Sequence, residues 1–185
     1  RNDDVRRVIV NRHKVIKLLR DILDEENFLE IETPILSAGT DEGAREFIVP
    51  TRKQPGFFYT LPQAPQQFKQ MLMVSGYEKY FQFARCFRDE DSRGDRQPEF
   101  TQIDIEASFT NQDQIMTMTE GMLRQVFSKV LNVELGEFPV LSWAEAMRDF
   151  GNDRPDLRNS MRLVDIADLM SSVDFKVFQG PANDP

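Results

Sequence analysis

Two stretches of this sequence decide its fold: residues 79–88, KYFQFARCFR, and residues 100–109, FTQIDIEASF. Both predict long β-strands, and the charged segment between them, which contains Gly94 and Pro98, predicts a loop. Because side chains alternate across a strand, one face of the pair is expected to be largely apolar, with Phe81, Phe83, Ile103 and Ile105. The opposite face is expected to carry small residues and a polar group, namely Arg88, Gln102, Asp104 and Glu106, with Phe100 at the edge.

The segments around these strands complete an α+β chain. Apolar residues recur at helical spacing from Val8 to Leu23 and from Ile115 to Val130, which predicts amphipathic helices ending near Asn27 and spanning residues 112–131. These helices could cover the apolar sheet face. A further helix is expected to start at Pro65. The remaining predictions are strands at 28–36, 47–49 and 57–61, a loop at 37–46, and a short strand and short helix within 138–157. The predicted fold is thus an antiparallel sheet flanked by helices.

The composition excludes several classes of protein. The 185 residues are 40% hydrophobic and 29% charged, which is typical of a globular domain. The net charge of −8 argues against a dominant basic surface for nucleic acid, although it does not exclude local contacts with RNA. One cysteine and one histidine form neither a disulfide framework nor a zinc motif. With no long apolar run and no signal segment, a cytoplasmic protein without a membrane partner is expected, and both termini look cut.

The polar sheet face admits two interpretations. In the simpler one, it is the solvated side of a half-exposed antiparallel sheet. The choice of residues favours a ligand site, because solvated faces are rich in Lys, Glu and Thr, whereas here one Arg lies among Gln, Asp and Glu beside an aromatic ring. Arg binds phosphate through two hydrogen bonds, Phe stacks on bases, and Asp and Gln can hold an ammonium group. An aminoacyl adenylate needs these contacts.

Four segments carry a resemblance to a known family. Residues 87–91, FRDED, with residues 96–104, RQPEFTQID, resemble motif 2 of class II aminoacyl-tRNA synthetases in its aspartyl form. Residues 28–34, FLEIETP, resemble the end of motif 1; residues 40–45, TDEGAR, resemble the flipping loop; and residues 61–70, LPQAPQQFKQ, resemble the amino-acid specificity segment. Residues 178–183 resemble the start of the insertion domain of bacterial-type enzymes. The resemblance implies a catalytic-domain part at 1–158, with motifs 1 and 2, and the start of the insertion domain at 159–185.

The resemblance implies roles for residues at an ATP site. Arg88 would bind the ATP α-phosphate and the aspartate carboxylate, and would stabilise charge as that carboxylate attacks the phosphorus. Glu90 would bind the adenine amino group, Phe100 would stack on the adenine, and Gln97 would help to hold ATP. Mg²⁺ would bridge the phosphates, held mostly by the nucleotide, and no metal ligand is expected within this chain.

The resemblance also implies an aspartate site. Lys69 would pair with the substrate's side-chain carboxylate, and Gln66 would help to fix the amino acid. Gln102 and Asp104 would bind its ammonium group, over which Glu42 would close from the flipping loop. Arg93 and Arg96 have two open interpretations: contact with the tRNA acceptor end, or a solvated charged turn.

The implied reaction is activation of L-aspartate by ATP to aspartyl-adenylate and pyrophosphate, then transfer to tRNA. The implied protein is a homodimer through motif 1, around Pro34 and the first helix, although ordinary packing within one subunit would also explain those residues. Asp41 and Ala64 depart from the family's usual Pro and Ser. Motif 3 is absent, so the chain alone is expected to be inactive. The alternatives are an asparaginyl- or lysyl-tRNA synthetase and a non-catalytic paralogue that binds an amino acid or a nucleotide.

Overall fold

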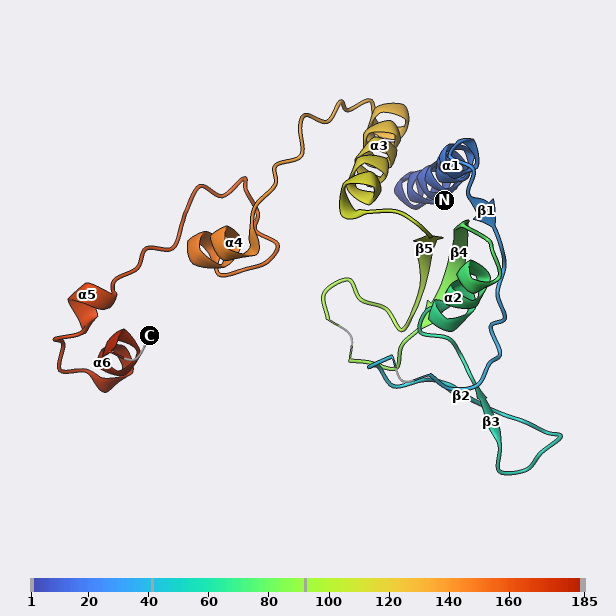
Figure 1. The fold of residues 1–185 in the computed structure, drawn as a ribbon, viewed down its shortest axis with the longest axis horizontal. Coiled ribbons are helices and arrows are strands. Elements are labelled where there is room, and N and C mark those ends of the chain that lie inside the picture. The colour runs from blue at the N-terminus through green and yellow to red at the C-terminus, as the bar shows by residue number, and fades with distance from the viewer. Residues whose placement is uncertain (1, 41, 92, 184–185) are drawn as a thin grey trace. The chain divides into compact units, whose positions relative to one another are not determined.

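The computed structural model describes residues 2–40, 42–91 and 93–183, and it divides into two compact units on either side of the Leu135–Gly136 bond. The ribbon in Figure 1 shows the helices and strands of both units. The predicted boundary at 158/159 separates a catalytic from an insertion domain of the family, which is not the same as a boundary between compact units, and it stays a prediction.

The first unit is built on the two long strands that the sequence predicts. β4 (Lys79–Phe87) and β5 (Glu99–Ala107) pair antiparallel along their whole length. β1 (Leu29–Glu30) adds a parallel edge beside Tyr80 and Phe81. The predicted strand over 28–36 is therefore only two residues long, and the polypeptide continues along the sheet as an irregular segment. The antiparallel pair and its helices confirm the predicted α+β class.

Two long helices cover the apolar face of the sheet, as predicted. α1 (Asp3–Glu25) and α3 (Gln112–Leu131) lie side by side on this face (Figure 1). The core between helices and sheet contains a small set of buried residues: Ile22, Leu23, Phe28, Phe81 and Met122. Only the second half of α1 reaches this core, because Val8, which the helical pattern includes, is 66% exposed.

The ends of α3 agree with the prediction residue for residue because both are capped, the first by side chains and the second by the backbone. The Asn111 side chain accepts a hydrogen bond from the backbone of Gln114, whose own side chain accepts from the backbone of Asn111. This capping box satisfies amide groups that the first helical turn leaves without partners. At the other end Asn132 adopts a left-handed conformation with φ of 56°, which stops the helix.

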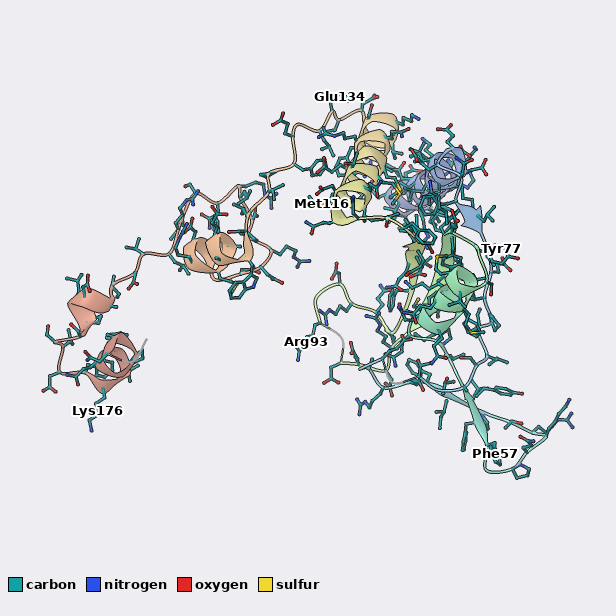
Figure 2. All side chains as sticks on the ribbon, viewed as in Figure 1. Phe57, Tyr77, Arg93, Met116, Glu134 and Lys176 are labelled. Carbon is teal, nitrogen blue, oxygen red and sulfur yellow. The ribbon has the colours of Figure 1, made fainter. Side chains whose placement is uncertain are left out.

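A hairpin and a short helix complete the first unit. β2 (Ile48–Pro50) and β3 (Phe58–Thr60) pair antiparallel near the two predicted strands, and Figure 2 shows Phe57 at the far end of the hairpin. α2 (Gln66–Val74) follows Pro65 and contacts both β4 and β5. Through Lys69, this helix supplies a side chain to the polar face of the sheet.

The second unit contains α4 (Trp143–Phe150), α5 (Ala167–Met170) and α6 (Lys176–Asn183). α4 is the helix predicted within 138–157, and a Ser142–Glu145 capping box starts it. The short strand predicted before it is wrong: residues 138–142 are irregular, and Pro139 has no amide hydrogen to donate to a neighbouring strand. Among the described residues, no helix is long and apolar enough to cross a membrane.

Candidate active site

The polar side chains of β4 and β5 share one face of the sheet, as their alternation predicts. Gln82 lies opposite Asp104, and Cys86 lies opposite Phe100. Directly opposed residues of antiparallel strands point to the same side. Phe100 and Asp104 are four residues apart on one strand, which corresponds to roughly 13 Å. This length matches a ligand with a base at one end and an amino acid at the other.

A cavity of about 450 Å³ lies at the Phe100 end of this face. The Arg88 guanidinium lies 5.1 Å from the centre of the Phe100 ring, and the Arg88 amide donates a 2.9 Å hydrogen bond to the Pro98 carbonyl, which fixes the backbone there. A cationic side chain beside an aromatic ring suits a phosphate attached to a base. The cavity is lined by all four residues predicted to bind ATP, together with charged neighbours: Arg88, Glu90, Gln97 and Phe100, with Asp91, Asp95, Arg96 and Pro98.

A buried charge cluster lies at the Asp104 end. Lys69, only 9% exposed, donates from Nζ to Asp104 Oδ1 at 2.9 Å, and its Nζ lies 3.3 Å from Glu106 Oε2. Burial alone would lower the pKa of Lys69, but the hydrogen bonds and negative charges of Asp104 and Glu106 outweigh it and raise that pKa above its ordinary value. Two residues expected to bind opposite ends of one substrate thus contact each other.

One atom of this cluster has no partner. Asp104 is 9% exposed, and its Oδ2 accepts no hydrogen bond within the described part of the chain, because the neighbouring Tyr80 hydroxyl donates its one proton to Gln82 instead. A buried carboxylate oxygen without a donor is costly, so its presence indicates a ligand that supplies one. The cluster of Lys69, Asp104 and Glu106 carries a formal charge of −1, which favours a cationic group such as an ammonium.

The loop that carries Glu42 is tied to the rest of the site. The buried side chain of Gln63 donates to the Ala44 carbonyl and accepts from the Ala44 amide, both at 3.0 Å. Asp89 and Arg45 are joined by a backbone hydrogen bond, so the loop also meets the start of the β4–β5 connection. Glu42 is half-buried on this loop, two residues before the tethered Ala44. Asp41, the departure from the usual Pro, lies outside the described residues.

Replacing Gln63 by leucine is expected to loosen this loop. Both Ala44 backbone groups lose their partner, so amide hydrogen exchange in residues 42–46 should become about 10- to 100-fold faster. Hydrogen-exchange mass spectrometry of the chain would measure this change. Gln67→Leu, which changes an exposed glutamine nearby on α2, serves as the matched control and should leave the loop unchanged. Equal exchange in the Gln63→Leu and unsubstituted chains would contradict the tether.

The middle of the face holds Cys86 and Gln102. The Cys86 sulphur lies 3.2 Å from Gln102 Oε1 and can donate to it. Burial raises the pKa of the Cys86 thiol to about 11; Arg88 opposes this shift, while Asp104 and Glu42 reinforce it. The thiol is therefore protonated at neutral pH and acts as a donor, not as a nucleophile. Gln66, half-buried on the first turn of α2, lies three residues before Lys69 and therefore near it on the helix surface.

Arg93 and Arg96 lie on the loop between β4 and β5, where Figure 2 shows Arg93. Both side chains are exposed, and both line a second cavity, of about 400 Å³, together with Gly43, Ala44 and Glu90. This position is compatible with contact to an RNA end and equally with a solvated turn, so both interpretations stand.

Sequence reasoning missed five residues of this site. It placed Glu106 on the polar face but gave it no role, and it assigned none to Gln63, Thr33, Tyr80 or Gln82. Strand alternation could have indicated Tyr80 and Gln82, which occupy the same face as Cys86. Thr33 and Gln63 lie in irregular segments, where no periodicity indicates which way a side chain points.

Within the described ranges, no group of three or more His, Cys, Asp or Glu side chains is arranged to hold a metal ion. The prediction that Mg²⁺ would be held mostly by the nucleotide therefore remains a prediction, and no residue of this chain is assigned to the ion.

The fold is that of a class II synthetase domain, an antiparallel sheet flanked by helices, with a cavity at one end of its polar face and a buried charge cluster at the other. The sequence matches the family described as tRNA synthetases class II (D, K and N) over residues 1–177. The chain therefore belongs to this family of ATP-dependent aminoacyl-tRNA ligases, whose members bind an amino acid, ATP and tRNA.

Proposed function

We propose that this chain forms the substrate-binding part of an aspartyl-tRNA synthetase of bacterial type. In this proposal ATP occupies the cavity beside Arg88 and Phe100, and L-aspartate lies against Lys69 and Asp104. The aspartate carboxylate attacks the ATP α-phosphorus, pyrophosphate leaves, and the aspartyl group is then transferred to tRNA. The observation that carries the choice of aspartate is the buried cluster of Lys69, Asp104 and Glu106.

The charges of this cluster suit aspartate better than lysine or asparagine. When the substrate ammonium binds Asp104 Oδ2, the two carboxylates gain a second cation, and Lys69 Nζ can turn to the substrate's side-chain carboxylate. Each charge then has a partner. A lysine side chain would bring a third cation next to Lys69, and asparagine would leave the Lys69 charge with a neutral amide, which binds less strongly than a carboxylate.

The chemical step needs no nucleophile from this chain, because the substrate carboxylate is the nucleophile. Arg88 acts by position and charge: its guanidinium bridges carboxylate and α-phosphate, holds them together, and offsets the negative charge that develops on the phosphorus oxygens. Glu90 and Phe100 fix the base, Gln97 supports ATP, and Glu42 closes the ammonium side of the site with Gln66 and Gln102.

The proposal has four further parts. Arg93 and Arg96 contact the tRNA acceptor end, and Mg²⁺ accompanies ATP. The protein is cytoplasmic and forms a homodimer through motif 1. Exposed apolar residues on the first half of α1, Val5, Val8, Ile9 and Val10, support a partner surface there. The departure at Ala64 removes a hydroxyl but no charge on which the proposed site depends.

Two other functions compete with this one. An asparaginyl enzyme would use the same ATP site, and the family includes that specificity. A non-catalytic relative would bind an amino acid or a nucleotide without activation. The complete set of Arg88, Glu90 and Phe100 around one cavity argues against lost chemistry.

Binding of non-reactive adenylate analogues tests the proposal directly. Sulphamoyl analogues of aspartyl-, asparaginyl- and lysyl-adenylate would be titrated by calorimetry into the synthetase that contains this chain. We expect the aspartyl analogue to bind at least about 100-fold more tightly than the other two, because it alone satisfies both charges. Tightest binding of the asparaginyl or lysyl analogue would overturn the assignment of aspartate, and binding of none by a folded protein would contradict the adenylate site itself.

A further inference from the structure

Two hydroxyl groups meet on one amide oxygen beside the amino-acid end of the site. Tyr80 donates to Gln82 Oε1 at 2.8 Å, and Thr33, from the irregular segment after β1, donates to the same oxygen at 2.9 Å. Tyr80 is fully buried, and Gln82 is 9% exposed. Polar groups this deeply buried are retained only when their hydrogen bonds are satisfied, so the arrangement is specific.

This hydroxyl pair lies next to the charge cluster. In the antiparallel ladder Gln82 is directly opposite Asp104, and Tyr80 is directly opposite Glu106. Opposed side chains start from Cβ atoms only about 5 Å apart. Burial raises the pKa of the Tyr80 phenol far above its ordinary value, and the adjacent Asp104 carboxylate raises it further through its charge and its proximity to the hydroxyl, with smaller contributions from Cys86 and Glu106. The phenol therefore remains a hydrogen-bond donor at every pH at which the protein would work.

The hydrogen-bonding pattern fixes the amide of Gln82. Because both hydroxyls use Oε1, the side-chain nitrogen is directed away from them, and it donates to no residue in the described part of the chain. Asp104, its opposite neighbour, is held on one oxygen by Lys69, while Oδ2 lacks a donor. A carboxylate held at only one oxygen can rotate about its last torsion, whose preference is broad.

We propose that Tyr80 and Thr33 are positioning residues for amino-acid binding. They hold the Gln82 amide beside Asp104, and the amide limits rotation of the carboxylate so that Oδ2 stays directed at the substrate ammonium. The Gln82 amide carries no charge, so it does not compete with the substrate ammonium for Asp104 as a second lysine would. This inference rests on the proposed function only in assigning the ammonium to Asp104.

Single variants of the synthetase that contains this chain test the role. Tyr80→Phe and Thr33→Val each remove one hydroxyl, and each is expected to raise the KM for the amino acid about 3- to 10-fold. The kcat and the KM for ATP should change less than about twofold, because the ATP end is roughly 13 Å away. Thr33→Ser keeps the hydroxyl and should leave the KM for the amino acid close to that of the unsubstituted enzyme. Tyr59→Phe, at an exposed tyrosine, is the matched control.

The double variant separates a shared action from two independent ones. Because both hydroxyls act through one oxygen of Gln82, Tyr80→Phe with Thr33→Val should raise the KM by clearly less than the product of the single effects. Three results would each overturn the proposal. The double variant could raise the KM for the amino acid by the full product of the single effects, the KM for ATP could rise as much as the KM for the amino acid, or Thr33→Val could leave the KM unchanged in a folded protein. If Tyr80→Phe does not fold, the Thr33→Val and Thr33→Ser pair decides alone.

Asp104→Asn distinguishes failure of this inference from failure of the proposed function. A large rise in the KM for the amino acid in Asp104→Asn, with silent Tyr80→Phe and Thr33→Val variants, would sink only the positioning role. An unchanged KM in Asp104→Asn would sink the assignment of the ammonium itself, and the positioning role with it.

Discussion

Replacing Arg88 by lysine is expected to lower kcat/KM for amino-acid-dependent pyrophosphate exchange about 100- to 1,000-fold in the synthetase that contains this chain. Lysine keeps the positive charge but loses the planar fork that can bridge a carboxylate and a phosphate at once. It also loses the guanidinium contact with Phe100, over whose ring Arg88 Cζ lies 5.1 Å from the centre. Steady-state exchange with ATP and amino acid varied in turn would measure the effect.

Arg85→Lys is the matched control for this prediction. Arg85 lies three residues earlier, on β4, and is exposed on the other sheet face, where it pairs with Glu99 at 2.9 Å. An exposed pair of this kind contributes little to stability. We expect Arg85→Lys to leave exchange within about twofold of the unsubstituted enzyme. Equal losses in the two variants would contradict a specific role for the Arg88 guanidinium in the reaction.

Replacing Lys69 by alanine is expected to raise the KM for aspartate about 10- to 150-fold while leaving the KM for ATP nearly unchanged. The loss corresponds to one buried charge-assisted hydrogen bond to the substrate's side-chain carboxylate, about 1.5–3 kcal/mol. Since Asp104 and Glu106 raise the pKa of Lys69, the lysine is protonated throughout the usual assay range. A comparable rise in the KM for ATP would contradict its assignment to aspartate.

The same substitution is expected to destabilise the fold. Removing Lys69 leaves the buried carboxylates of Asp104 and Glu106 without their cation, which costs about 3–5 kcal/mol in comparable buried pairs. Adding Asp104→Asn removes one of these charges and should recover part of that loss in a denaturant titration. Lys53→Ala, at an exposed position near the hairpin tip, should change neither stability nor KM. A double variant less stable than Lys69→Ala would contradict the cluster.

The polar face was predictable because it depends on local geometry. Alternation along two nine-residue strands places Gln102 and Asp104 on one side whatever the rest of the chain does. α3 was equally predictable, since its apolar spacing and its end residues agree. The sequence pattern and the strand register therefore lead to the same face, with Arg88 and Phe100 at one end.

The contacts that define the charge cluster were not predictable in the same way. Lys69 and Asp104 are 35 residues apart, and no periodicity indicates that a helix side chain will reach that strand position. The tether from Gln63 to Ala44 also joins two irregular segments. The strand expected at 28–36 failed for a related reason: alternation predicts an extended segment, but a strand also needs a neighbour to pair with, and only two residues have one.

The central claim is that this site activates aspartate, and its most direct test is ATP–pyrophosphate exchange by the synthetase that contains this chain. Labelled pyrophosphate would be supplied with aspartate, asparagine or lysine in parallel. We predict exchange with aspartate alone, because only this amino acid has both an ammonium for Asp104 and a carboxylate for Lys69. Exchange that depends on asparagine or lysine instead, or no exchange from a folded protein with any of the three, would contradict the account.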